Sequence, residues 1–83
     1  MVTDPSVVTL TWVKAKNGEI PAYAVQGERS GLYVGRCPQS GELVVGEVNP
    51  SQHVCIVVTC WKAFRHSEYE VLCAIPHASI LPQ

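Results

Sequence analysis

The sequence predicts an all-β protein built from antiparallel sheets. Its apolar residues come in short runs of Val, Ile, Leu and Tyr, and turn-forming residues separate the runs. This is the spacing of antiparallel strands that follow one another through hairpins. No stretch of helical length shows the periodicity of an amphipathic helix. The 83 residues allow one domain with a small core.

The N-terminal half predicts one strand and then a hairpin. Apolar and polar residues alternate over residues 7–14, and Asn17-Gly18 then supplies the left-handed backbone that ends a strand. Residues 23–26 and 32–36 flank residues 27–31, which begin and end with glycine. Because glycine lets the backbone reverse tightly, we expect these two flanking segments to pair as a hairpin.

Three more strands are expected in the C-terminal half. Residues 43–48 follow the turn-forming segment 38–41 and end before Asn49-Pro50, where proline disfavours helix in its predecessor. Residues 53–59 are almost continuously apolar, which predicts a strand buried on both faces or at a protein interface. Residues 68–75 form the last expected strand. The tail, 76–83, carries two prolines and is either disordered or docked on a second subunit.

Composition excludes some partners and suggests a location. Six Lys and Arg residues against seven Asp and Glu residues give a formal charge of −1, without a basic stripe for nucleic acid. Residues 1–6 have neither a basic run nor an apolar block, so we expect no signal peptide and no membrane span. The expected location is cytoplasmic, with non-classical release as the alternative.

The cysteines are expected to be buried thiols, because disulfides belong mainly to secreted chains. Paired C-x-x-C motifs are absent, and strand alternation would send neighbouring residues to opposite faces, so we expect no metal site. The four cysteines and three histidines that this concerns are Cys37, Cys55, Cys60, Cys73, His53, His66 and His77.

An enzyme would need a nucleophile beside a base. Cys55 or Cys60 with His53 or His66 is the only candidate dyad in the sequence. No strand-to-helix elbow and no glycine-rich phosphate loop accompanies it. We therefore expect a binding module without catalytic residues and without a cofactor.

The order of several motifs along the chain resembles the DM-nine repeat family. The motifs are Trp12, Asn-Gly-Glu-Ile-Pro at 17–21, Gly-Leu-Tyr-Val-Gly-Arg at 31–36, Gly-Glu-Leu-Val-Val-Gly at 41–46 and Tyr-Glu-Val-Leu at 69–72. The family occurs mostly as tandem repeats in insect and mollusc proteins, in natterin-like toxins and in mannose-binding lectins of innate immunity. The resemblance runs from about Trp12 to Cys73, so residues 1–83 are expected to form a single domain with one repeat.

The resemblance also implies how the fold is completed. In the family's lectins, strands of two repeats interleave into one all-β body. A lone repeat would leave strand edges open, and open edges pair with other chains. We expect a homodimer with two-fold symmetry, completed by interleaved strands. A monomer with a blunted edge is the alternative.

In the lectin members, sugar recognition involves two acidic residues and a lysine, whose places correspond here to Glu28, Glu42 and Glu47. Carboxylates accept hydrogen bonds from vicinal hydroxyls, and a lysine donates to them. Glu47 occupies the lysine position, which removes that donor. Trp61 lies where the family usually has a glycine pair, and its ring could stack on a sugar. The candidate sugar-binding residues for mannose-type glycans are therefore Glu28, Glu42, Glu47 and Trp61.

Other conspicuous side chains are expected to have structural roles. Trp12 and Tyr33 are expected in the core, and Arg36 is expected to pair with a carboxylate such as Glu70 or Glu47. Two other functions remain open beside sugar binding. One is an assembly module that uses residues 53–59 and Trp61 as contact surface, and the other is a toxin-like membrane-active accessory, for which no amphipathic inserting segment is present.

Overall fold

The computed structural model describes residues 8–76, which form one six-stranded antiparallel sheet. The strand order across the sheet is β1-β6-β2-β3-β4-β5. The predicted all-β class is therefore confirmed. The strands are β1 (Val8–Lys16), β2 (Tyr33–Gln39), β3 (Glu42–Asn49), β4 (Val54–Thr59), β5 (Lys62–His66) and β6 (Glu68–Pro76).

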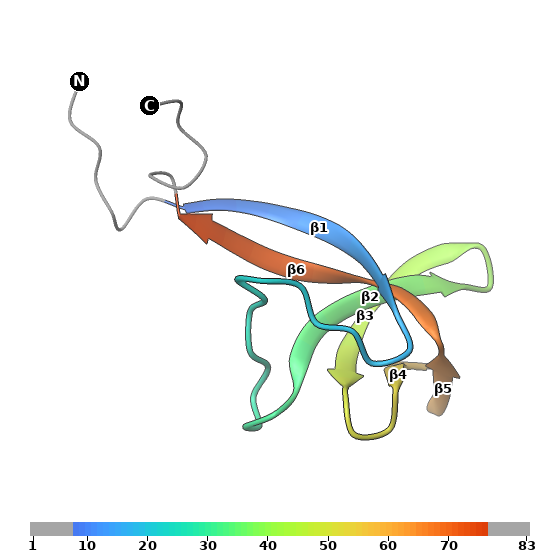
Figure 1. The fold of residues 1–83 in the computed structure, drawn as a ribbon. Coiled ribbons are helices and arrows are strands. Elements are labelled where there is room, and N and C mark those ends of the chain that lie inside the picture. The colour runs from blue at the N-terminus through green and yellow to red at the C-terminus, as the bar shows by residue number, and fades with distance from the viewer. Residues whose placement is uncertain (1–7, 77–83) are drawn as a thin grey trace.

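Strands β2 to β5 follow one another as hairpins, whereas β6 returns across the molecule to lie between β1 and β2. β6 pairs with β1 along its whole length, from Val8↔Pro76 to Lys16↔Glu68. It pairs with β2 at only two positions, Gly35↔Val71 and Arg36↔Glu70. The result is a long two-stranded arm, β1 and β6, joined to a body made of β2 to β5 (Figure 1).

The hairpin expected from residues 23–26 and 32–36 forms only in part. Residues 23–26 are not a strand but make two isolated bridges, Ala24↔Cys73 and Gln26↔Tyr33. The N–H of Val25 donates to the carbonyl of Leu72 at 2.9 Å, while the carbonyl of Val25 accepts from Val34 at 3.0 Å. The segment is thus shared between β6 and β2 where these strands diverge, and so it builds a ladder with neither.

β5 is a strand that the sequence did not predict. Its residues, Lys-Ala-Phe-Arg-His, are mostly polar and lack the apolar character of the other strands. It is held by pairing with β4 from Cys55↔His66 to Thr59↔Lys62. Tertiary pairing therefore overrides a weak local preference here.

Strand alternation divides the sheet into two faces, which we call the inner and outer face. The inner face carries the core, whose buried members are Cys37, Val48, Cys55, Val57, Tyr69, Val71 and Cys73. On β4, Cys55 and Val57 are buried, but Val58 is 63% exposed on the outer face. Within this chain, the run 53–59 is therefore buried on one face only, not on both.

Of the two aromatic residues that were expected in the core, only one packs against it. Tyr33 packs against the core, as predicted. Trp12 is not a core residue: it is only half-buried, and it pairs with Leu72 on the outer face. The guanidinium of Arg36 lies 4.4 Å from the centre of its ring, so a cation–π contact covers the indole in place of the core.

The tight turns have left-handed backbone. The Asn17-Gly18 turn ends β1 as predicted, with φ of 54° and 87°. The turn between β4 and β5 consists of Cys60 and Trp61, with φ of 51° and 62°. Both central residues of a type I′ hairpin have positive φ, and the usual choice is Asn-Gly. A cysteine and a tryptophan in these positions are therefore unusual.

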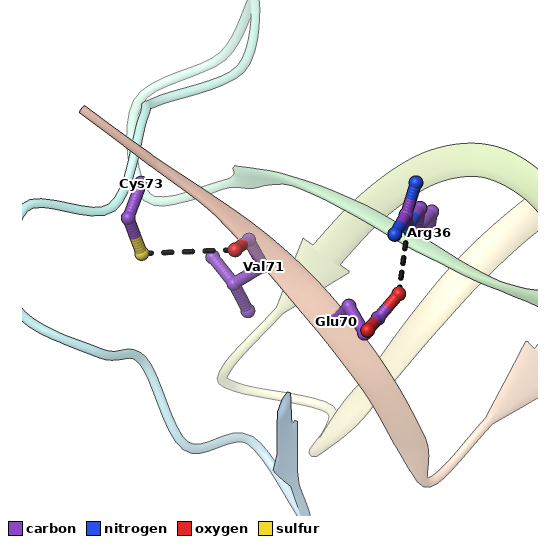
Figure 2. A network of polar contacts seen from close by, with 4 residues as sticks. All are labelled: Arg36, Glu70, Val71 and Cys73. Atoms are coloured by element: carbon purple, nitrogen blue, oxygen red, sulfur yellow. Dashed lines mark hydrogen bonds and ion pairs between the residues drawn. The ribbon is translucent and has the colours of Figure 1, made fainter. Parts of the chain in front are cut away.

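All four cysteines are free thiols, and three of them are buried. The sequence predicted buried thiols, which holds for Cys37, Cys55 and Cys73 but is wrong for Cys60, which is exposed. Figure 2 shows the Cys73 thiol directed at the carbonyl of Val71, 3.6 Å away. The described residues contain no helix with the length and hydropathy of a membrane crossing. The expectations for residues 1–6, for His77 and for the rest of the tail lie outside the described residues.

Candidate functional site

A cavity of about 530 Å³ lies on the outer face, which we call the outer cavity. Its wall includes Glu28, Arg29 and Leu32, from the loop before β2. Apolar side chains of β3 and β4, namely Val45, Ile56 and Val58, line it together with Leu32. The polar groups around them come from Glu28, Arg29, Glu47, Asn49, Gln52 and Arg65.

Strand register places a carboxylate and a guanidinium on either side of one apolar residue. Glu47 of β3 is opposite Ile56 of β4, and Ile56 is opposite Arg65 of β5. Residues directly opposite on neighbouring strands share a face, so all three side chains belong to the outer face. Adjacent strands lie about 4.8 Å apart, which puts the backbones of Glu47 and Arg65 roughly 9.6 Å from each other.

The loop of residues 27–31 forms the wall of the cavity. Its ends are joined by a hydrogen bond from the N–H of Gly27 to the carbonyl of Leu32, at 2.8 Å. Gly31 has a φ of +85°, which lets the chain turn into β2. A Cβ placed on Gly27 would lie 3.9 Å from the carboxyl carbon of Glu47. The loop therefore brings Glu28 and Arg29 to the same cavity as Glu47.

The charged side chains of this cavity do not form ion pairs with one another. Within residues 8–76, the ion pair of the structure is Arg36 with Glu70, at 2.6 Å from Nε to Oε1 (Figure 2). It confirms the predicted partner of Arg36. The side chains of Glu28, Arg29, Glu47 and Arg65 form no hydrogen bond or ion pair within that part of the chain. Their donors and acceptors are therefore available to a ligand.

A family model provides the identification. The DM9 repeat model matches residues 2–57 and, in a second overlapping match, residues 27–80. This chain belongs to the DM9 repeat family. Because the two matches overlap over residues 27–57, the chain is not necessarily a single repeat. The shared stretch contains both Glu28 and Glu47. A comparison with curated proteins found no match.

In this DM9 chain, the predicted sugar-binding residues do not all lie together. Glu28 and Glu47 line the outer cavity, whereas Glu42 and Trp61 do not. Glu42 begins β3 and is five residues from Glu47, and an odd separation on a strand puts two side chains on opposite faces. Trp61 is 99% exposed at the turn between β4 and β5.

The outer cavity also contains polar residues that the sequence did not single out for binding, namely Asn49, Gln52 and Arg65. Asn49 ends β3, and its side-chain oxygen accepts from the N–H of Gln52 at 3.3 Å, which holds the two residues side by side. Arg65 could not be assigned to this face before β5 was known. For Asn49 and Gln52, the turn-forming pair Asn49-Pro50 was the sequence signal that could have pointed to them.

The candidate cysteine–histidine dyad has unfavourable electrostatics. Cys55 is opposite His66, but burial raises the pKa of the Cys55 thiol to about 12, so it is protonated at neutral pH. The Nε2 atom of His66 lies 2.7 Å from the side-chain oxygen of Gln39. His53 contacts the carbonyl of Asn17 through Nδ1 at 3.1 Å. Residues 8–76 contain no group of three or more His, Cys, Asp or Glu side chains that could hold a metal ion.

Proposed function

We propose that this DM9 chain binds carbohydrate, and specifically mannose-type glycans, in the outer cavity. The observation that carries the proposal is the pair of unpaired carboxylates, Glu28 and Glu47, at a cavity lined in part by apolar side chains. Carboxylates accept hydrogen bonds from adjacent hydroxyls, and an apolar surface receives the C–H groups of a sugar ring. The resemblance to the mannose-binding members of the family supports the same ligand class.

The cavity also supplies donors, although Glu47 occupies the place of the family's lysine. The amide of Gln52 and the guanidinium groups of Arg29 and Arg65 line it. Each guanidinium carries five N–H donors, so a ring hydroxyl or ring oxygen has a partner without a lysine. The geometry therefore supports sugar binding with a different donor set.

Calorimetric titration with mannose and a mannan oligosaccharide tests this proposal. We expect saturable heat from the unmodified chain and a roughly tenfold weaker affinity for Glu28→Ala or Glu47→Gln, because each change removes a charge-assisted hydrogen bond worth about 1.5–3 kcal/mol. Glu42→Gln is the matched control, since Glu42 lies away from the cavity, and its affinity should be unchanged. A folded chain that gives no heat with either ligand would refute the proposal.

A specific observation favours assembly as a second function. The large exposed apolar side chains of the sheet all belong to the outer face: Val8, Leu10, Leu43, Val45 and Val58. Exposed apolar area of this kind often marks a protein interface. We propose that a second copy of the chain covers part of it in a homodimer. If no sugar binds, this assembly is the remaining role.

A further inference from the structure

We infer that the outer cavity prefers acidic saccharides, with Arg65 binding the carboxylate of a hexuronate residue. The inference rests on the proposed carbohydrate binding and names the substrate class of the same site. It follows from the unpaired guanidinium of Arg65, from the position of Arg65 across Ile56 from Glu47, and from the distribution of charge around the cavity.

Arg65 differs from Arg36, the other arginine on the outer-face side of a strand. The guanidinium of Arg36 is already engaged, by the carboxylate of Glu70 at 2.6 Å and by the ring of Trp12 at 4.4 Å. Arg65 is exposed, lines the cavity and has no hydrogen-bond or ion-pair partner within residues 8–76. A free guanidinium presents a planar fork that matches a carboxylate with two parallel hydrogen bonds.

The spacing of the row Glu47–Ile56–Arg65 suits one pyranose ring. The two outer residues are separated by two strand spacings, roughly 9.6 Å between backbones, and both side chains line the same cavity as Ile56 between them. A ring lying over Ile56 would present hydroxyls to Glu47 on one side. A carboxylate at its C6 position would then meet Arg65 on the other side.

The charges on either side of Ile56 favour this orientation. Glu47 would repel a carboxylate placed on its side of Ile56, since like charges at short range destabilise each other. Arg29 and Arg65 balance these two carboxylates, so the cavity as a whole carries no net charge that would exclude an anion. The ligand's hydroxyls therefore belong on the Glu47 side and its carboxylate on the Arg65 side.

Two oligosaccharides that differ only at C6 provide the test. A β-1,4-mannan trisaccharide and a β-1,4-mannuronate trisaccharide have the same rings and linkage, but the second carries a carboxylate in place of each hydroxymethyl group. We expect the mannuronate to bind the full chain at least roughly tenfold more tightly at low salt, because the added contact is charge-assisted. This preference should shrink as salt rises.

Arg65→Gln should remove the preference, because it weakens mannuronate binding at least roughly tenfold more than it weakens the binding of neutral mannan. Lys62→Gln is the matched control, because it removes one cation from the same strand at a residue outside the cavity. It should leave both affinities unchanged. Circular dichroism of each variant shows whether the fold is retained.

The outcomes separate the two proposals. Mannan binding with no preference for mannuronate, or an equal loss of both ligands in Arg65→Gln, would overturn the inference and leave carbohydrate binding standing. A chain that binds neither trisaccharide would overturn both. Binding of mannuronate without measurable mannan binding would support the inference for acidic saccharides and overturn the neutral mannose-type ligand of the proposed function.

Discussion

Two cysteines of one hairpin, Cys55 and Cys60, illustrate how position controls chemistry at the scale of a residue. Cys55 is fully buried, and desolvation raises its thiol pKa from 9.0 to about 12. Burial also raises the pKa of Cys37 and of Cys73. Cys60 is exposed at the tip of the hairpin. Because the thiolate is the nucleophile, only one of the four thiols has both access and an unburied environment.

We therefore expect an alkylating reagent at pH 8 to modify the folded chain rapidly at one thiol, and all four after denaturation. Mass spectrometry of the products should place the rapid modification on Cys60, and Cys60→Ser should abolish it. Equal rates for all four thiols at pH 8 would contradict the assignment.

Above pH 9 the thiols of the unfolded chain ionise, while the thiol of Cys55 in the folded chain stays protonated up to about pH 12. The free energy of unfolding should therefore fall over this range of pH.

Single residues also show what a sequence can and cannot predict about the site. Glu28 and Glu47 were found through the resemblance to lectins. The separation of Glu42 from Glu47 was readable in principle, since five positions along one strand reverse the face. The position of Arg65 on this face was not readable, because it depends on pairing between β4 and β5. That pairing is a tertiary property, and the local sequence of β5 contains too few apolar residues to reveal it.

At the scale of an element, the hairpin of β4 and β5 has a strained turn. Cys60 and Trp61 both have positive φ, which costs a residue with a Cβ roughly 1–2 kcal/mol. Such strain often persists where the side chain is used in contact with something else. Trp61 is almost fully exposed, and its predicted role in sugar binding stays a prediction.

Replacing the turn by the favoured sequence should stabilise the protein. We expect Cys60→Asn combined with Trp61→Gly to raise the free energy of unfolding by about 1–2 kcal/mol, because Asn and Gly tolerate the left-handed region. Urea denaturation measures this change. Ser40→Asn is the control at the other two-residue hairpin, where Gly41 already occupies the second position, and a smaller effect is expected. An unchanged or lowered stability of the double variant would show that the turn is not strained.

The elements predicted from sequence match the structure best where local and long-range preferences agree. The strands with regular apolar residues, such as β3 and β6, were predicted nearly to their ends. Residues 23–26 were predicted as a strand because they are apolar, but they bond alternately to β6 and β2. Trp12 was expected in the core, and a cation from another strand covers it instead. These departures all arise from partners distant in sequence.

At the scale of the whole molecule, the open edges of the sheet matter most. β1 is an edge strand of nine residues. Its C-terminal half carries Lys14 and Lys16, which discourage pairing with another strand, but its N-terminal half exposes Val8 and Leu10. An edge of this kind favours pairing with the same edge of a second copy, which gives a closed two-fold dimer.

We expect the purified chain to have the mass of a dimer in analytical ultracentrifugation. Leu10→Lys should shift it to the mass of a monomer, because a charge on the edge opposes pairing. Ala22→Lys places the same charge on an exposed loop residue and should leave the dimer intact. A monomeric unmodified chain at all accessible concentrations would contradict the proposed homodimer.

The close approach of β4 to β3 at Gly46 has a consequence for how this fold tolerates substitution. A Cβ at this position would lie 2.7 Å from a methyl group of Val57 and 2.9 Å from the carbonyl carbon of Ile56, so no side chain fits without moving the backbone. The next residue, Glu47, faces the cavity instead. Under the proposed carbohydrate binding, a change at position 47 would alter the preferred ligand while the neighbouring glycine preserves the scaffold. Ligand preference and fold would then be separable at adjacent positions of one strand.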